Sequence, residues 1–389
     1  MMRTLASALT LTLAAVPLAG SEVSLPVLPS VLAPGAACSG ASGSVASAMP
    51  WEQQALGLAR IRRTAGGSPG GAGVTVAVVD TGVSAQAPAL SGRVTAVGAA
   101  GGDCVGHGTF VAGLIAAAPV PGVRFAGVAD RAGILAVRGT DARGTATPGS
   151  VAAGIRAAAQ AGARIVVVSP ALAQGSAALS SAVSYATRQD CLVIAAAAPD
   201  ATGSRTASPP PPRDYWPAAD PAVLSVLDVD AKGSRPAGAP VPLHADLTAP
   251  GDGVVGVGPS GKGHYIGSGA SLAAAYVAGT AALVRAAHPG LSAEQTAARL
   301  TGTAYPADVP RLDPYAAVTS VRAAGRPAPP DPGAGRPVRL ATDPAAAVAG
   351  RRALALAAGG VAVALGVAWT AAVSRLRRRA RSAGGRDGS

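Results

Sequence analysis

The sequence is poor in charged residues and contains no asparagine. Only 13% of its 389 residues are charged, whereas 49% are hydrophobic. In soluble globular domains about 25% of residues are charged, so this balance indicates that apolar segments are joined to a globular part. The absence of asparagine means that no site in this chain can use an asparagine amide.

Lysine is almost missing as well, so arginine carries most of the positive charge. Only Lys232 and Lys262 occur among 32 basic residues. The formal net charge of +12 would fit a nucleic-acid partner, but residues 374–389 alone hold six Arg and one Asp. A basic cluster behind an apolar segment is typical of the cytoplasmic side of a membrane. We therefore expect no nucleic-acid partner.

Two long apolar runs lie near the ends of the chain. Residues 1–20 combine Arg3 with a short apolar run, as a signal peptide does. Residues 353–373 carry no charge, and at about 1.5 Å per residue they reach about 30 Å, the thickness of the hydrocarbon core of a bilayer. The second run predicts one transmembrane helix, with the basic tail at 374–389 in the cytoplasm and the globular part outside.

The segments between these runs have different compositions. Residues 21–49 are predicted to be an N-terminal extension, and residues 50–322 are long enough for one large α/β domain. Residues 323–352 are rich in Pro and Gly and predict an extended tether. The sequence shows no internal repeat and no metal-ligand cluster, and we expect no cofactor.

Three cysteines in an exported chain allow one disulfide and one remaining thiol. Cys104 lies three residues before His107, and pairing it with Cys38 would hold the N-terminal extension beside that histidine. Cys191 precedes an apolar strand and would then be a buried thiol. Spacing leaves the pairing open, and residues 35–38 also weakly resemble a lipoprotein cleavage site.

Three short segments carry residues suited to a hydrolytic site. Residues 74–79 form an apolar run that predicts a buried parallel strand, with Asp80 at its C-terminal end. His107 lies between two glycines and begins a predicted apolar helix. Ser271 opens a second apolar helix, whose N-terminus favours a developing oxyanion. Taken singly, each residue also has a purely structural explanation: Asp80 can belong to a turn, His107 can lie at the surface, and Ser271 can be the N-cap of a helix.

Taken together, they supply a catalytic triad. A serine hydroxyl becomes a nucleophile when a base takes its proton, and the imidazole base needs a carboxylate to orient it. Asp80, His107 and Ser271 can play these roles, in the chain order of subtilisin. Three motifs resemble the catalytic motifs of subtilisin-family proteases: Val-Val-Asp-Thr-Gly-Val at 78–83, Gly-His-Gly-Thr-Phe-Val-Ala-Gly at 106–113 and Gly-Ala-Ser-Leu-Ala-Ala-Ala-Tyr-Val-Ala-Gly at 269–279.

The resemblance implies a subtilisin-like α/β fold, in which a mainly parallel sheet has helices on both faces. It implies cleavage of a polypeptide substrate in which Ser271 attacks, His107 acts as base and then as acid, and Asp80 orients His107. Within the family the chain is similar to mycosins, the membrane-anchored proteases of actinobacterial type VII secretion systems. Cys104 before the histidine motif and the segment 312–318 carry that likeness, which implies type VII secretion membrane components as partners.

One feature of the family is missing. Subtilisin-like proteases bind the oxyanion with an asparagine that follows an apolar strand. Aligned without gaps, residues 190–199 cover that strand, and Pro199, which has neither an N–H nor a side-chain donor, takes the asparagine's place. A shift of one residue would instead bring Asp200 there, where only a protonated carboxyl can donate. Pro170 would also remove a donor from the predicted substrate-binding strand.

These departures leave two hypotheses open. The first is a membrane-anchored serine endopeptidase, associated with type VII secretion, whose activity is reduced. The alternative is a catalytically silent, mycosin-like scaffold that stabilises a secretion membrane complex.

Overall fold

The computed structural model describes most of the globular part of the chain: residues 24–64, 70–200, 210–236, 238–321, 369, 370 and 373. The predicted signal peptide, tether and basic tail lie outside the described residues, as do all but three residues of the predicted transmembrane helix. The chain divides into two units, Met1–Arg326 and Pro327–Ser389. The elements below belong to the first unit.

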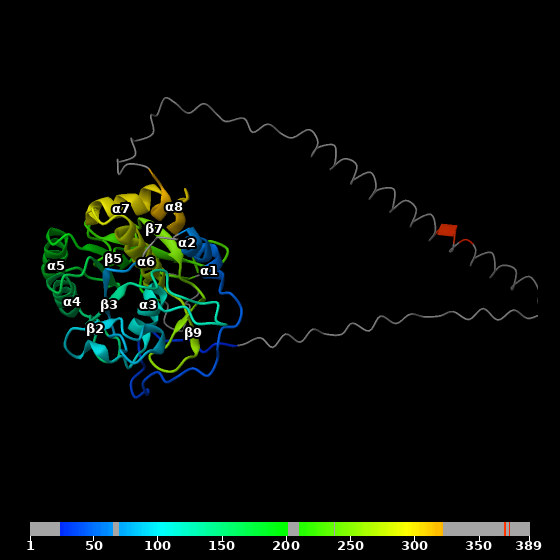
Figure 1. Ribbon diagram of the computed structural model, residues 1–389, viewed down its shortest axis with the longest axis horizontal. Helices are drawn as coiled ribbons and strands as arrows, with labels where there is room; N and C mark the ends of the chain where they lie inside the picture. The colour runs from blue at the N-terminus through cyan, green and yellow to red at the C-terminus, as the bar shows by residue number, and fades with distance from the viewer. Residues whose placement is uncertain are drawn as a thin grey trace, which may run out of the picture. The chain divides into compact units, whose positions relative to one another are not determined.

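A seven-stranded parallel sheet forms the centre of this unit (Figure 1), with the strand order β2-β3-β1-β4-β5-β6-β7. The strands are β1 (Thr75–Asp80), β2 (Val94–Ala96), β3 (Gly133–Arg138), β4 (Ile165–Val168), β5 (Leu192–Ala196), β6 (Leu224–Val229) and β7 (Leu247–Pro250). A separate antiparallel pair consists of β8 (Val254–Val257) and β9 (His264–Gly267).

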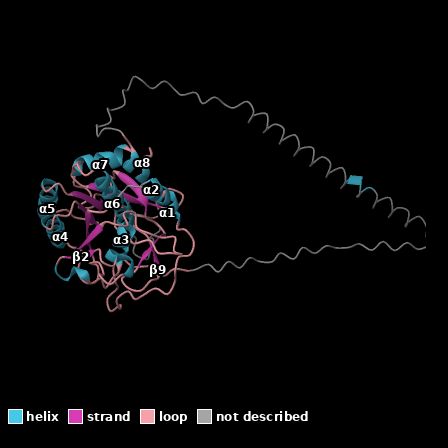
Figure 2. Cartoon of the chain, viewed as in Figure 1, coloured by secondary structure: helices cyan, strands magenta, loops and turns pink. Residues whose placement is uncertain are grey.

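Helices flank the strands on both sides (Figure 2). The α-helices are α1 (Trp51–Ala55), α2 (Leu58–Thr64), α3 (His107–Ala116), α4 (Pro148–Gln160), α5 (Ala177–Arg188), α6 (Ala270–Ala287), α7 (Ala293–Gly302) and α8 (Pro314–Thr319). Two short 3-10 helices are η1 (Pro88–Leu90) and η2 (Gly98–Gly101).

Side chains along each strand point alternately to the two faces of the sheet, so the core has two layers. In β1, Val76 and Val78 belong to the layer that contains residues of α3 and α6, whereas Ala77 and Val79 belong to the layer that contains residues of α4 and α5. All four side chains are completely buried. The middle of a strand that is covered on both faces needs consecutive apolar residues, which explains the apolar run from Val76 to Val79. The predicted parallel sheet with helices on both faces is confirmed.

Helix α6 runs through the middle of the first layer. Every residue from 270 to 285 in it is buried, and a helix that is apolar on all sides is expected in such a place. Among the described residues it is the one helix long and apolar enough to cross a membrane, but 89% of its apolar stretch is buried inside the protein. We therefore interpret α6 as a core helix, separate from the membrane helix predicted at 353–373.

The N-terminal extension lies against the domain. The N–H of Leu28 donates to the carbonyl of Ile266 in β9, over 3.0 Å. A disulfide joins Cys38 to Cys104, and Cys191 is a free, buried thiol. The structure thus settles the pairing that spacing left open, and it fixes the extension beside the loop that precedes His107.

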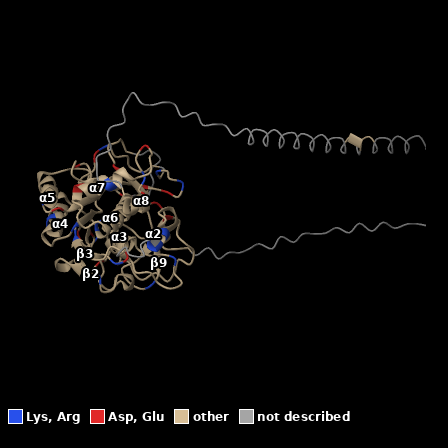
Figure 3. Cartoon of the chain, turned by 45° about the horizontal axis from the view of Figure 1, so that its top comes forward, with Lys and Arg blue, Asp and Glu red and all other residues tan. Residues whose placement is uncertain are grey.

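Charged side chains are sparse over this unit, and in the view of Figure 3 the two signs are scattered among loops and helices. One group of them joins two core elements. The carboxylate of Asp190, just before β5, accepts from Arg285 of α6 over 2.7 Å and pairs with Arg164 at 3.0 Å. This ion pair fixes the C-terminal part of α6 to the sheet.

Candidate active site

The structure brings together the three residues that the sequence singled out. Asp80 ends β1, His107 begins α3, and Ser271 is the second residue of α6. His107 Nδ1 lies 2.8 Å from Asp80 Oδ2, and His107 Nε2 lies 3.1 Å from Ser271 Oγ. The three residues are 1%, 6% and 0% exposed, respectively. They form a chain of hydrogen bonds from a carboxylate through an imidazole to a hydroxyl.

Local backbone features set this spacing. Asp80 lies at the C-terminal edge of the sheet, where functional groups of parallel sheets gather. Gly106 precedes α3 with a φ of 90°, a left-handed conformation that favours glycine. A Cβ atom at Gly108 would lie 2.0 Å from the carbonyl oxygen of Gly82. The two glycines around His107 therefore let α3 begin directly against the loop that follows Asp80.

The buried triad is electrically coupled. Burial alone would raise the pKa of Asp80, but the charge of His107 and the hydrogen bond with it hold that pKa below its ordinary value. Burial alone would lower the pKa of His107, but the charge of Asp80 and a hydrogen bond to Asp200 raise it well above 6.5. The arrangement thus favours a positively charged imidazole over a neutral one.

Asp103 supports the triad and was missed by the sequence analysis. Its carboxylate accepts from the Thr81 hydroxyl over 2.8 Å, from the Gly106 N–H over 2.8 Å, and from the N–H and hydroxyl of Thr109 over 2.8 and 2.7 Å. Burial raises the pKa of Asp103, and the charge of Asp80 adds to that rise. Asp103 thus ties the residue after Asp80 to the first turn of α3. An acidic residue four positions before the histidine is the signal that could have indicated it.

The residue at the oxyanion position is Asp200. The N–H of Ser271 donates to Asp200 Oδ1 over 3.1 Å, and the Ser271 hydroxyl donates to Asp200 Oδ2 over 2.6 Å. Pro199 lines the neighbouring cavity. The ungapped placement of Pro199 at this position is therefore wrong, and the alternative shifted by one residue is confirmed. Because the loop leaves β5 after Ala196, its exact course was not readable from the sequence.

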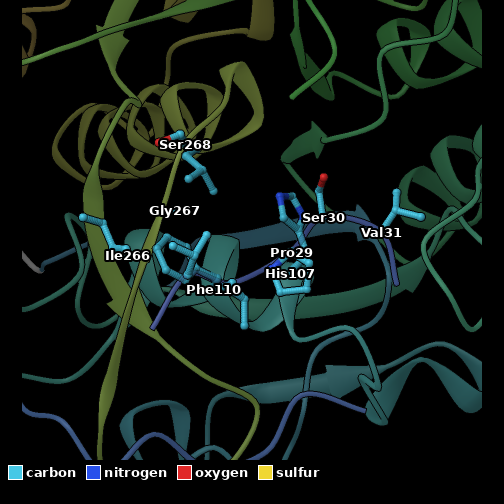
Figure 4. A pocket seen from close by; sticks show the side chains of 11 residues that line it. Pro29, Ser30, Val31, His107, Phe110, Ile266, Gly267 and Ser268 are labelled. Carbon is cyan, nitrogen blue, oxygen red and sulfur yellow. The ribbon is translucent and has the colours of Figure 1, made fainter. Parts of the chain in front are cut away.

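Among the described residues, two cavities are found that have His107 in their walls, and residues of the N-terminal extension line both. The larger has a volume of about 560 Å³ and the smaller about 310 Å³. Ser30 and Val31 belong to the walls of both, as does His107. Figure 4 shows the larger cavity, with His107 beside Pro29 and Ser30 and with Ile266 across from them. The extension therefore crosses the cleft next to the triad.

The smaller cavity also contains the predicted substrate-binding strand end. Ser169 and Pro170, which follow β4, line it together with Asp80 and Asp200. In the part of the chain that the structure describes, no group of three or more His, Cys, Asp or Glu residues could hold a metal ion.

Comparison with known proteins places this geometry in a family. Residues 71–332 match the family model of the subtilases, peptidase family S8. The chain belongs to the subtilase family. The predicted enzyme class, a serine endopeptidase of the subtilisin type, is thereby confirmed.

Several relatives align over the catalytic domain. Thermitase from Thermoactinomyces vulgaris is 33% identical over 261 residues, which cover 64% of this chain and 89% of thermitase. Subtilisin DY from Bacillus licheniformis is 34% identical over 177 residues, 46% of this chain and 62% of the relative. Mycosin-3 from Mycobacterium tuberculosis (strain ATCC 25618 / H37Rv) is 34% identical over 166 residues, 33% of this chain and 35% of the relative. The matched parts thus span less than two thirds of subtilisin DY and of mycosin-3.

Solved structures agree with the subtilisin-like fold. The crystal structure of MycP1 with its N-terminal propeptide removed is similar with a TM-score of 0.61 and 30% identity, covering 72% of this chain and 99% of that one. A chain in the structure of an intact ESX-5 inner membrane complex is similar with a TM-score of 0.64 and 27% identity, covering 88% and 94%. The resemblance to mycosins is confirmed.

Proposed function

We propose that this chain cleaves polypeptides through a covalent intermediate on Ser271. Ser271 Oγ bonds to the peptide carbonyl carbon while its proton passes to His107. The C–N bond then breaks as His107 returns that proton to the leaving amine. Water attacks the acyl ester and gives a proton to His107, which passes it to Ser271, and the new carboxylic acid leaves. Asp80 orients His107 and stabilises its positive charge throughout.

One observation carries this proposal. The hydrogen-bonded sequence of Asp80, His107 and Ser271 has the separations that proton transfer requires, 2.8 and 3.1 Å. Ser271 also lies at the N-terminus of α6, where its N–H can donate to a developing oxyanion.

We further propose that the protease domain at 50–322 lies outside the cell membrane and works beside a type VII secretion complex. The signal peptide at 1–20, the tether at 323–352, the uncharged stretch at 353–373 and the basic tail at 374–389 support one membrane crossing with a cytoplasmic C-terminus. Similar chains occur in an intact ESX-5 inner membrane complex and in its periplasmic assembly. Membrane components of such a system are the partners that this likeness supports.

We expect the activity to be low. In subtilisin, removal of the oxyanion asparagine lowers turnover by roughly 100- to 1,000-fold, and this chain has no asparagine. The placement of Asp200 at Ser271 favours a second candidate, a domain that serves the complex as a scaffold without turnover.

Labelling with a fluorophosphonate distinguishes the two candidates. Attack by Ser271 forms an Oγ–P bond and expels fluoride, and the serine proton passes to His107. The test uses the full chain in membranes, beside Ser271→Ala. We expect labelling that disappears in the variant. A folded wild-type chain that takes no label would contradict the protease and support the scaffold.

A further inference from the structure

Asp200 lies against both the nucleophile and the base of the triad. Its side chain is 8% exposed, and among the described residues its three hydrogen-bonding partner groups belong to Ser271 and His107. Oδ1 accepts from the N–H of Ser271 over 3.1 Å, while Oδ2 accepts from the Ser271 hydroxyl over 2.6 Å and lies 3.1 Å from His107 Nε2. The two oxygens of one carboxyl group thus engage the oxyanion donor, the nucleophile and the base.

This pattern is that of a cleaved product. A newly formed C-terminal carboxylate would place one oxygen at the Ser271 N–H and the other between Ser271 and His107. The backbone is shaped to admit such a group, because a Cβ atom at residue 269 would lie 1.9 Å from Asp200 Oδ1. Gly269 therefore leaves the room that the carboxylate fills.

The charge of Asp200 opposes catalysis at each of its contacts. A carboxylate only accepts hydrogen bonds, so it cannot stabilise an oxyanion as an asparagine amide does. The Ser271 hydroxyl donates its proton to a hydrogen bond with Asp200. For proton transfer, the same hydroxyl would have to donate to His107. It also adds a second negative charge beside His107, which already faces Asp80, and this favours the protonated imidazole that cannot act as a base.

We propose that Asp200 is an internal, product-like ligand that keeps this catalytic site closed, and that Ser271 works only when the Asp200 side chain leaves. The inference rests on the proposed function, since it assigns a resting state to the same nucleophile. The ligand that replaces Asp200 is the carbonyl of a peptide substrate, or the carboxylate of its product.

Substitutions at position 200 separate two effects of the Asp200 side chain: it occupies the site, and it offers no hydrogen-bond donor to an oxyanion. Asp200→Ala empties the position, and Asp200→Asn replaces the acceptor by an amide of nearly the same shape that can donate. Asp214→Asn removes the same charge at an exposed position and serves as the matched control. All variants are made in the full chain, in membranes, with and without Ser271→Ala.

Two rates are measured. We expect Asp200→Ala and Asp200→Asn to react with a fluorophosphonate about tenfold faster than the wild type, or more. In the wild type, Ser271 can react only after its hydrogen bond with Asp200 is broken, and the loss of one hydrogen bond of ordinary strength changes a rate by about tenfold. Hydrolysis of fluorescent casein should be roughly 100-fold faster in Asp200→Asn than in Asp200→Ala, because only the amide restores an oxyanion donor. Asp214→Asn should match the wild type in both.

A pH profile tests the same contact independently. The labelling rate rises as His107 loses its proton, and the midpoint of that rise should move to lower pH in Asp200→Asn, because one of the two carboxylates beside His107 is gone. Resistance of each variant to added trypsin shows that it is folded. An unchanged midpoint in a folded Asp200→Asn chain would overturn the proposal.

The outcomes also separate this inference from the proposed function. If labelling depends on Ser271 but no substitution at Asp200 accelerates it, Asp200 does not close the site and the protease stands. If Asp200→Asn still takes label after Ser271→Ala, the nucleophile is wrong and the proposed function fails. If no folded variant takes label, both fail and the scaffold is supported.

Discussion

Glu52 gives a quantitative test of how burial governs stability in this fold. It lies in α1 and is 0% exposed. One of its oxygens, Oε1, accepts from the N–H of Val255 over 2.9 Å, while Oε2 has no hydrogen-bond partner among the described residues. Burial raises the pKa of Glu52 from 4.5 to about 7, although the hydrogen bond from Val255 opposes the rise.

The size and sign of the effect follow from linkage. At about 1.4 kcal/mol for each pH unit, the gap between 4.5 and about 7 amounts to about 3 kcal/mol. The folded state binds the proton more tightly than the unfolded state. The contribution of Glu52 to the free energy of unfolding is therefore full below about pH 4.5 and is lost as the pH rises through about 7.

Glu52→Gln isolates this contribution, because glutamine keeps the acceptor for Val255 and does not titrate. We expect the wild type to lose about 3 kcal/mol relative to Glu52→Gln between about pH 4.5 and about pH 8.5. Urea unfolding followed by tryptophan fluorescence, to which the adjacent Trp51 contributes, measures it. Glu294→Gln, at an exposed site in α7, is the control and should show no such difference. A stability difference between wild type and Glu52→Gln that does not vary with pH would refute the reasoning.

Two further predictions concern the supports of the site. The double substitution of Cys38 and Cys104 to Ala removes a disulfide that links residues 66 positions apart. We expect it to lower the free energy of unfolding, measured by urea titration, by about 4 kcal/mol. A loss below about 1 kcal/mol would contradict that account. Asp103→Ala removes the acceptor shared by Thr81 and Thr109, so Ser271-dependent labelling should fall by roughly 100-fold as His107 shifts from Asp80. Labelling at the wild-type rate would show that Asp103 has no positioning role.

The sequence was informative where one residue stands in a strong local pattern. Asp80 ends an apolar strand, and His107 and Ser271 lie in the first turns of apolar helices. The pattern therefore predicted both the element and the place of each side chain in it. Because the ends of these elements meet at one edge of a parallel sheet, the triad could be assembled before its distances were known.

Contacts made by loops could not be predicted in this way. The position of Asp200 depends on the path of the chain after Ala196, and one residue of register decides whether a proline or a carboxylate meets Ser271. Asp103 acts through four hydrogen bonds to residues in two other segments. The pairing of Cys38 with Cys104 required the course of the extension across the domain. None of these leaves a periodic signal.

The burial of α6 determines how heat can inactivate the enzyme. Ser271 belongs to a helix whose next fourteen residues are also buried, and core helices open only with the domain as a whole. Heating therefore cannot displace the nucleophile while leaving the rest of the molecule intact. For the nucleophile, we therefore expect thermal inactivation to follow the unfolding of the domain core.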